Sequence, residues 1–414
     1  MREETWIRTI PGGVTAAGGF SAAAHAAGIK YQNRTDMALI FSDTPCTAAG
    51  TFTSNVVKAA PVQWDMAIVK TEQPVRAVVI NSGIANAATG AQGLALCRST
   101  AQAMAEQYGG EEAEVLVAST GVIGMQIDEG RVTAGCAALY AARAAGEEAG
   151  TAAAKAIMTT DTHKKESAVA VTLTDGSEIR IGAMTKGSGM IHPNMCTMLG
   201  FVTTDAAIGK PLLQRAVSEV VEDTFNMISV DGDTSTNDTY VVLANGQAGN
   251  RPILTAGEDY ERFRAGLYRV SRDLAKQMAG DGEGATALFE CRVTGAATVA
   301  DAKKLAKSVI GSSLCKAAIY GHDSNFGRIL CALGYAGVPF DPQRVDLWYE
   351  SAAGRMKIVE NGMGTGYDEA EATRLLSEKA VTVLVDMHAG SAEATAWGCD
   401  LSYDYVKINA DYRS

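Results

Sequence analysis

Residues 186–201 divide the 414-residue chain near its middle and read Lys-Gly-Ser-Gly-Met-Ile-His-Pro-Asn-Met-Cys-Thr-Met-Leu-Gly-Phe. The first part, through Asn194, contains glycines, a serine and a proline, which are typical of a loop. From Met195 the sequence becomes apolar and then threonine-rich, which predicts the start of a buried strand. Thr197 therefore stands where a loop meets a rigid element, and such junctions often carry nucleophiles.

Two explanations fit Thr197. A β-branched residue favours a strand, so the threonine can be purely structural. Alternatively, cleavage of the Cys196–Thr197 peptide bond would give Thr197 a new α-amino group, whose unperturbed pKa is roughly 7.7–8.0. That amine could act as the base for the neighbouring hydroxyl. We therefore predict a self-cleavage site between Cys196 and Thr197, with Thr197 as the nucleophile.

The motif Lys-Gly-Ser-Gly-Met-Ile-x-Pro-Asn-Met-x-Thr-Met-Leu resembles the self-cleavage segment of the ornithine acetyltransferase family, also called glutamate N-acetyltransferases. Enzymes of this family transfer an acetyl group in the cyclic arginine pathway. They usually have alanine where this chain has Cys196, and both residues are small. The resemblance extends from near residue 10 to the last residue.

Composition and charge narrow the class of protein. Hydrophobic residues make up 47% of the chain and charged residues 20%, as in ordinary globular proteins. The net charge of -11 argues against nucleic acid or an anionic membrane as a partner. The eight cysteines form no C-x-x-C pair, which argues against a zinc or redox site and for reduced thiols. The acidic N-terminus lacks the pattern of a signal peptide, so we predict a cytoplasmic enzyme.

Hydrophobic patterns predict an α/β protein. Residues 9–70 are expected to form short strands and turns, and the last residues are expected to fray. Strands are predicted near 37–41, 77–80, 115–118, 240–244, 288–293 and 381–386, and a hairpin over 167–181. Helices are predicted near 93–108, 130–156 (one or two), 205–224, 258–279, 299–310 and 368–379.

The resemblance implies a more specific architecture. It implies a self-cleaving fold with an N-terminal threonine nucleophile, in which sheets pack against helices. Cleavage would give an α-chain of residues 1–196 and a β-chain of residues 197–414, assembled as an α2β2 heterotetramer. A smaller C-terminal α/β region is expected at about 300–414.

A Ser-Thr-Gly loop follows the strand predicted at 115–118. Backbone N–H groups and a hydroxyl can converge there on an anion, although the same residues can simply end a strand. In the family that this chain resembles, the corresponding Thr-Gly pair forms the oxyanion hole. The resemblance therefore assigns that role to Thr120 and Gly121.

Two further loops carry acidic residues. The segment 231–238 could be a calcium loop, but its sixth position is Thr236 rather than glycine and its twelfth is Val242 rather than glutamate, so Asx turns are favoured. The glycines of 280–286 are typical of phosphate loops, yet no Gly-Lys-Ser/Thr follows and Glu283 lies in the middle. A carboxylate there would repel phosphate and attract an ammonium group. The resemblance likewise implies that Glu283 contacts substrate.

The remaining site residues come from the resemblance and from charge. The resemblance implies that Thr160, Asn409 and Ser414 contact substrate, together with Thr197. Charge alone matches Lys186 to the α-carboxylate of an amino acid and Glu283 to the side-chain ammonium of ornithine. No cofactor or metal motif is found, and whether acetyl-CoA also serves as an acetyl donor is left open.

These features predict transfer of acetyl from N2-acetylornithine to glutamate through an acetyl-Thr197 intermediate, giving ornithine and N-acetylglutamate. The first alternative is an aminopeptidase or amidase with an N-terminal nucleophile, which would pass the acyl group to water. The second is an α/β binding protein for amino acids, which would need no cleaved bond. Turnover of acetylornithine with and without glutamate distinguishes the acetyltransferase from the first alternative. The number of chains in the purified protein distinguishes it from the second, because a binding protein would remain one chain.

Overall fold

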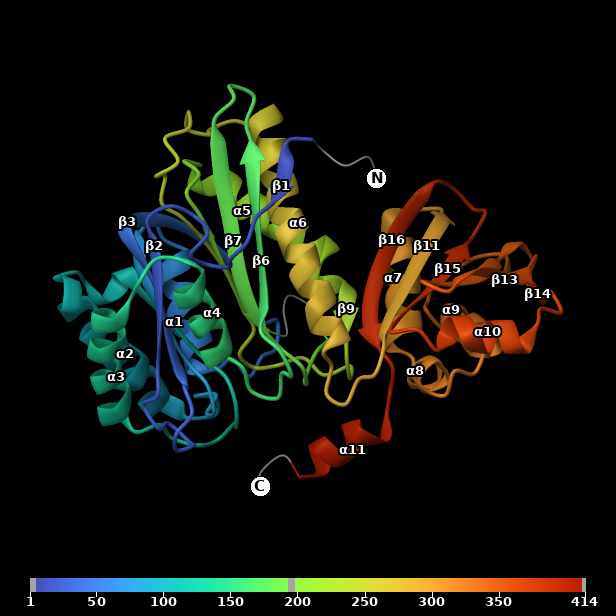
Figure 1. Cartoon of the computed structure of the whole chain (residues 1–414), viewed down its shortest axis with the longest axis horizontal. Coiled ribbons are helices and arrows are strands. Elements are labelled where there is room, and N and C mark those ends of the chain that lie inside the picture. Colours follow the sequence, from blue (N-terminus) through green and yellow to red (C-terminus); the bar gives the residue numbers. More distant parts are fainter. Residues whose placement is uncertain (1–4, 193–197, 412–414) are drawn as a thin grey trace. The chain divides into compact units, whose positions relative to one another are not determined.

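The computed structural model describes residues 5–192 and 198–411. The chain forms two compact units (Figure 1). Unit 1 comprises Met1–Gly187, Asn194–Asn226 and Thr234–Leu274, and unit 2 comprises Ser188–Pro193, Met227–Asp233 and Ala275–Ser414. The predicted cleavage point, Cys196–Thr197, and the predicted substrate residue Ser414 lie outside the described residues.

Unit 1 is built on a mixed sheet with the strand order β1-β6-β7-β8-β10-β3-β4-β5, and β2 pairs with β3. Its strands are β1 (Ile7–Thr9), β2 (Phe20–His25), β3 (Met37–Phe52), β4 (Val75–Asn81), β5 (Val115–Ser119), β6 (Lys165–Thr172), β7 (Glu178–Lys186), β8 (Leu199–Thr204) and β10 (Thr239–Ala244). Its helices are α1 (Ala60–Val69), α2 (Gly90–Tyr108), α3 (Glu129–Ala142), α4 (Glu147–Ala156), α5 (Lys210–Asp223) and the first part of α6 (Glu258–Gly280).

Strand β3 joins the two halves of this sheet. Its first part pairs with β2 and β4, its second part pairs with β10, and the register shifts between Phe41 and Cys46. Side chains from both halves, such as Val78 of β4 and Phe201 of β8, share one hydrophobic core. The two halves therefore pack face to face.

The alternation of side chains along β4 shows how the layers form. Val78 and Ile80 point into the core between the two halves of the sheet, whereas Ala77 and Val79 pack with residues of α2 and α3. Helices α2 and α3 thus cover the outer face of the β2–β5 half (Figure 1). Because β4 and β5 are buried on both faces over most of their length, their sequences are continuously apolar at 77–80 and 115–118.

Unit 2 contains a second sheet with the strand order β14-β13-β12-β15-β11-β16-β9. Its strands are β9 (Ile228–Ser229), β11 (Leu288–Ala296), β12 (Asp346–Ser351), β13 (Gly354–Glu360), β14 (Met363–Gly364), β15 (Ala380–Asp386) and β16 (Ala392–Cys399). Its helices are α7 (Val299–Gly311), α8 (Ser313–Tyr320), α9 (Phe326–Gly334), α10 (Glu369–Leu376) and α11 (Tyr403–Ala410). Helix α7 packs on β11 and β16, and α10 packs on β12 (Figure 1).

The predicted α/β class, with sheets packed against helices and an α/β region toward the C-terminus, is confirmed. The predicted hairpin is formed by β6 and β7. The helical prediction for 130–156 is resolved into α3 and α4, separated by a turn in which Gly146 has a φ of +97°.

Three predicted elements need correction. Helix α5 begins at Lys210 rather than at Asp205, because the Asp205 carboxylate instead accepts the N–H groups of Gly18 and Arg180. The prediction for residues 9–70 missed α1, whose first turn contains a proline, a usual sign of a helix start. The expected fraying after residue 405 is wrong through Ala410, because α11 forms there and the Ser402 hydroxyl accepts the Tyr405 N–H at its start.

Candidate active site

The Ser-Thr-Gly loop continues directly from β5, and we call residues 119–122 the donor loop. The parallel β4–β5 ladder ends at the pair Asn81 and Ser119. The Thr120 N–H then donates to the Asn81 carbonyl at 3.0 Å, and the Val122 N–H donates to the Gly83 carbonyl at 3.1 Å. The backbone on both sides of Gly121 is therefore fixed to the segment that follows β4.

Two donors of this loop have no acceptor in the described part of the chain. They are the Gly121 N–H, which lies in sequence between the two bonded N–H groups, and the hydroxyl of Thr120. The Thr120 side chain is buried, with 9% of the residue's surface exposed. Two donors without an acceptor, on adjacent residues at a strand end, are suited to a negatively charged oxygen.

Gly121 cannot be replaced here without moving the backbone. Its φ is +130°, in the region that favours glycine. A Cβ at this position would lie 2.3 Å from the carbonyl carbon of Gly83 and 2.7 Å from the N of Ile84. Close backbone approach therefore explains why the sequence has glycine at this position.

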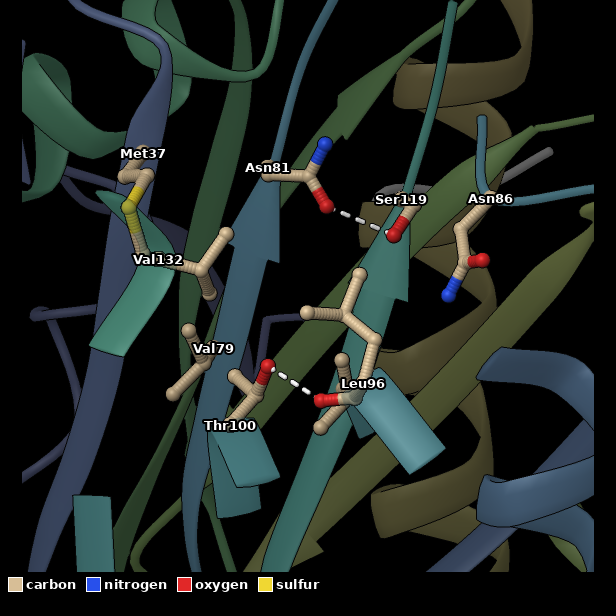
Figure 2. A pocket seen from close by; sticks show the side chains of 9 residues that line it. Met37, Val79, Asn81, Asn86, Leu96, Thr100, Ser119 and Val132 are labelled. Carbon is tan, nitrogen blue, oxygen red and sulfur yellow. Dashed lines mark hydrogen bonds between the residues drawn. The ribbon is translucent and has the colours of Figure 1, made fainter. Parts of the chain in front are cut away.

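A polar network lies behind the donor loop. The Ser119 hydroxyl donates to the Asn81 side-chain oxygen at 2.6 Å, and the Asn81 side-chain N–H donates to the Ile84 carbonyl at 2.9 Å. Figure 2 shows the Ser119–Asn81 bond beside a small, mostly apolar pocket that also involves Asn86 and Thr100. The pocket has room for about one water molecule, so it supports the loop and is too small for an amino-acid substrate.

Lys186, predicted to contact a carboxylate, lies at the end of β7 in a buried charged cluster. Its Nζ is 4.0 Å from the Asp161 carboxylate, and the Nζ of the fully buried Lys165 is 2.7 Å from it. The Asp161 carboxylate also accepts the N–H groups of Thr159 and Gly187. Burial by itself would raise the pKa of Asp161, but Lys186, Lys165 and the hydrogen bonds lower it below the ordinary value. Positive charge is thus gathered around one ionised carboxylate.

Thr160 precedes Asp161 in sequence and is half-buried. Its position in the chain places it next to the residue on which both lysines converge. In this segment the resemblance indicated Thr160, and the sequence-based prediction did not include Asp161 and Lys165. The available signal was a carboxylate, Asp161, four residues before a lysine at the start of a strand.

In unit 2, Glu283 and Asn409, both predicted to contact substrate, are joined by a hydrogen bond. The Asn409 side-chain N–H donates to the Glu283 carboxylate at 2.8 Å, and Glu283 is 6% exposed. We call residues 280–286 the carboxylate loop. Its Glu283 N–H donates to the Ser188 carbonyl at 2.9 Å, and the Ser188 hydroxyl donates to the Asp281 carbonyl at 2.7 Å. The Gly-Ser-Gly segment therefore holds this loop.

Glycines surround Glu283 because there is no space for larger residues. A Cβ on Gly189 would lie 2.4 Å from the Glu283 carboxyl group. A Cβ on Gly284 would lie 2.6 Å from the N of Tyr405, at the start of α11. The Gly284 carbonyl accepts the Ser402 hydroxyl at 2.6 Å. Gly284 therefore packs the carboxylate loop against the backbone at the start of α11, and Gly189 leaves space for the Glu283 side chain.

Negative charge gathers near Glu283. Burial raises the pKa of Tyr405, and the nearby carboxylates of Asp231 and Glu283 raise it further. Asp231 accepts the N–H groups of Met190 and Ile191 at 2.7 and 2.8 Å. It also accepts the N–H of Asp233, which is the Asx turn predicted for this segment.

Among the described residues, no group of three or more His, Cys, Asp or Glu side chains could hold a metal ion. None of the described helices is long and apolar enough to cross a membrane. The seven described cysteines, all except Cys196, are free thiols.

The fold and the donor loop define a mixed α/β protein with a candidate oxyanion site on the end of a buried strand. Residues 21–414 match the model of the ArgJ family. The chain is 52% identical to the arginine biosynthesis bifunctional protein ArgJ of Symbiobacterium thermophilum, over 98% of this chain and 99% of the relative. It is 47% identical to the protein of the same name from Thermotoga neapolitana, over 96% of this chain and 99% of the relative. The chain therefore belongs to the ArgJ family, which confirms the resemblance inferred from sequence.

A solved structure gives a further match. The crystal structure of ornithine acetyltransferase complexed with ornithine from Mycobacterium tuberculosis is 40% identical to this chain. The match covers 47% of this chain and 100% of the solved chain, with a TM-score of 0.41.

Proposed function

We propose that this chain is an acetyltransferase of arginine biosynthesis that moves the acetyl group of N2-acetylornithine to glutamate. The observation that carries the mechanism is the pair of donors on Thr120 and Gly121, which have no acceptor in the described part of the chain. Attack on an amide carbonyl creates a negatively charged oxygen. Donors already fixed on a strand end stabilise that charge with little reorganisation.

Self-cleavage would come first. The Thr197 hydroxyl attacks the Cys196 carbonyl, and the acyl chain moves from the nitrogen to the oxygen of Thr197. This shift frees the α-amino group, and water then hydrolyses the ester. The products are a chain of residues 1–196, which ends in a carboxylate, and a chain that begins with Thr197.

Acetyl transfer would then proceed in two halves. The α-amine of Thr197 takes the hydroxyl proton as the oxygen attacks the acetyl carbonyl of acetylornithine, and the proton passes to the departing nitrogen of ornithine. The acetyl group remains as an ester on Thr197. The α-amine of glutamate attacks that ester, and N-acetylglutamate leaves.

Charge assigns the parts of the substrate. The lysines around Asp161 suit an α-carboxylate, with Lys186 as the contact. Glu283, with Asp231 near it, suits the side-chain ammonium of ornithine. In this proposal Thr160, Asn409 and Ser414 also contact substrate, as the resemblance implies.

The proposal includes the other expectations drawn from the resemblance. The relatives are named bifunctional, so acetyl-CoA is proposed as a second acetyl donor. The two chains are proposed to assemble as α2β2, without a resident cofactor. A cytoplasmic location is supported by the free thiols of the described cysteines. Family membership favours acetyl transfer over the aminopeptidase alternative.

The test combines intact mass with turnover. Wild-type protein should give two chains whose masses match residues 1–196 and 197–414, Thr197→Ala one uncut chain, and Thr197→Ser a partly cut sample. Continued ornithine release from acetylornithine should require glutamate. Two normal fragments from Thr197→Ala would refute Thr197 as the processing nucleophile, and ornithine release at the same rate without glutamate would favour the hydrolase.

A further inference from the structure

Asn237 lies just before β10 and is 7% exposed. Its side-chain N–H groups donate to two backbone carbonyls, those of Ala85 at 2.6 Å and Ser119 at 2.8 Å. Its side-chain oxygen accepts the Thr236 hydroxyl at 2.7 Å. Because both carbonyls require donors and the hydroxyl requires an acceptor, this network fixes the orientation of the amide.

The two carbonyls belong to the two segments that enclose Gly121. The Ser119 carbonyl is part of the same peptide group as the Thr120 N–H. Ala85 lies in the segment after β4, and its N–H donates to the Val122 carbonyl at 2.9 Å. One side chain therefore bridges the donor loop and the segment against which Gly121 is packed.

The same residue is tied to the strand that follows the proposed nucleophile. Thr239 of β10 pairs in parallel with Leu199 of β8, and its N–H donates to the Met198 carbonyl at 2.9 Å. Met198 directly follows Thr197 in the sequence. Asn237 thus connects the donor loop to the segment that directly follows the proposed nucleophile in the sequence.

We propose that Asn237 is a positioning residue that holds the Thr120 and Gly121 donors in register with the strands β8 and β10. This inference rests on the proposed function, because it assumes that the donor loop stabilises the oxyanion. The chemistry requires an amide, since one planar group must supply two N–H donors in divergent directions. A misplacement of about 1 Å in such a site can lower the rate by about 100-fold.

Asn237→Asp is the test variant, because aspartate has the same shape and lacks the two N–H donors. A matched control is Asn250→Asp. Asn250 is 4% exposed, and its side chain also donates to two carbonyls, those of Ala207 and Arg251, in a loop without proposed catalytic groups. Both variants lose the same type of contact, so both should lower the melting temperature.

The readout is the split between kcat and KM, with kcat calculated per cleaved chain from intact mass. We expect Asn237→Asp to lower kcat about 10- to 100-fold and to leave KM for acetylornithine within a few-fold. Asn250→Asp should keep the wild-type kcat. In a Thr120→Val background, Asn237→Asp should lower kcat less than it does alone, because one of the two donors that it positions is already missing.

Each result decides the inference. A wild-type kcat for Asn237→Asp, or a loss that is fully additive with Thr120→Val, would overturn it. If Asn237→Asp does not fold, Asn237→Ser, which keeps one donor, is judged by the same criteria. Failure of both variants to fold while Asn250→Asp folds would make Asn237 a folding residue and would also overturn it. A wild-type kcat for Thr120→Val would instead refute the proposed oxyanion role itself.

Discussion

The donor loop and the carboxylate loop present different chemical groups. The donor loop offers a backbone N–H and a short hydroxyl, and it is fixed by backbone hydrogen bonds at the end of buried strands. The carboxylate loop offers the side chain of Glu283, which is held by the side chain of Asn409. Asn409 lies on α11, a helix without buried residues. One region is therefore suited to a developing anion and the other to a cation.

The difference indicates where each region tolerates change. In the donor loop, the chemistry depends on where the backbone runs, so a substitution acts mainly through steric conflict or through the Thr120 hydroxyl. In the carboxylate loop, the chemistry depends on one charged group, so a substitution changes the strength of one contact. We therefore expect larger losses from substitutions in the donor loop than from substitutions in the carboxylate loop.

Gly121→Ala should have the largest effect. Its Cβ would lie 2.3 Å from the Gly83 carbonyl carbon, and backbone atoms cannot move aside cheaply. We expect kcat/KM to fall by about 1,000-fold or more, as for loss of an oxyanion donor with added distortion. Gly124→Ala is the control, because Gly124 also has a positive φ, +84°, but an added Cβ would meet nothing within 4 Å. Equal kinetics for the two variants would contradict the importance of the close approach.

Thr120→Val should have the next largest effect. It preserves the shape of the side chain and removes the hydroxyl, so kcat should fall by about 100- to 1,000-fold with little change in KM. Thr100→Val is the control, since the Thr100 hydroxyl is also buried but donates to the Leu96 carbonyl within α2. The measurement is kcat and KM of both variants from steady-state kinetics. A rate within a few-fold of wild type would mean that Thr120 only ends the strand.

Glu283→Gln should have a smaller and more selective effect. Loss of a charge-assisted contact costs about 1.5–3 kcal/mol, or about 10- to 150-fold in kcat/KM. The loss should fall on acetylornithine, which has a side-chain ammonium, and not on glutamate, which lacks one. Stopped-flow measurement of ornithine release isolates the first half-reaction. An equal loss in both halves would mean that Glu283 contacts the α-amino group that the two substrates share.

The sequence predicted the parts of the molecule that depend on local pattern. Apolar runs at 77–80 and 115–118 predicted β4 and β5. The pattern located the Ser-Thr-Gly loop after β5, and the resemblance assigned the oxyanion role to Thr120 and Gly121. The resemblance separately assigned Glu283 and Asn409 to substrate, and only the fold brings these distant residues to 2.8 Å. Asn237 was missed because its contact with Ser119 joins residues that are far apart in the chain. Lys165 was missed although its partner, Asp161, lies only four residues before it.

Asn409→Ala should have the smallest effect and should define how the carboxylate loop works. The Asn409 side chain donates to the Glu283 carboxylate at 2.8 Å and to the Tyr405 carbonyl at 3.0 Å. Loss of one such contact costs about 0.5–1.5 kcal/mol, or about 2- to 10-fold in kcat/KM for acetylornithine. Lys407→Ala is the control, because Lys407 is exposed on the same helix. If Asn409 acts by orienting Glu283, its substitution should have almost no further effect in Glu283→Gln, since the carboxylate that it orients is gone. A full, additive loss in that background would show that Asn409 contacts the substrate directly, and the carboxylate loop would then offer two independent contacts.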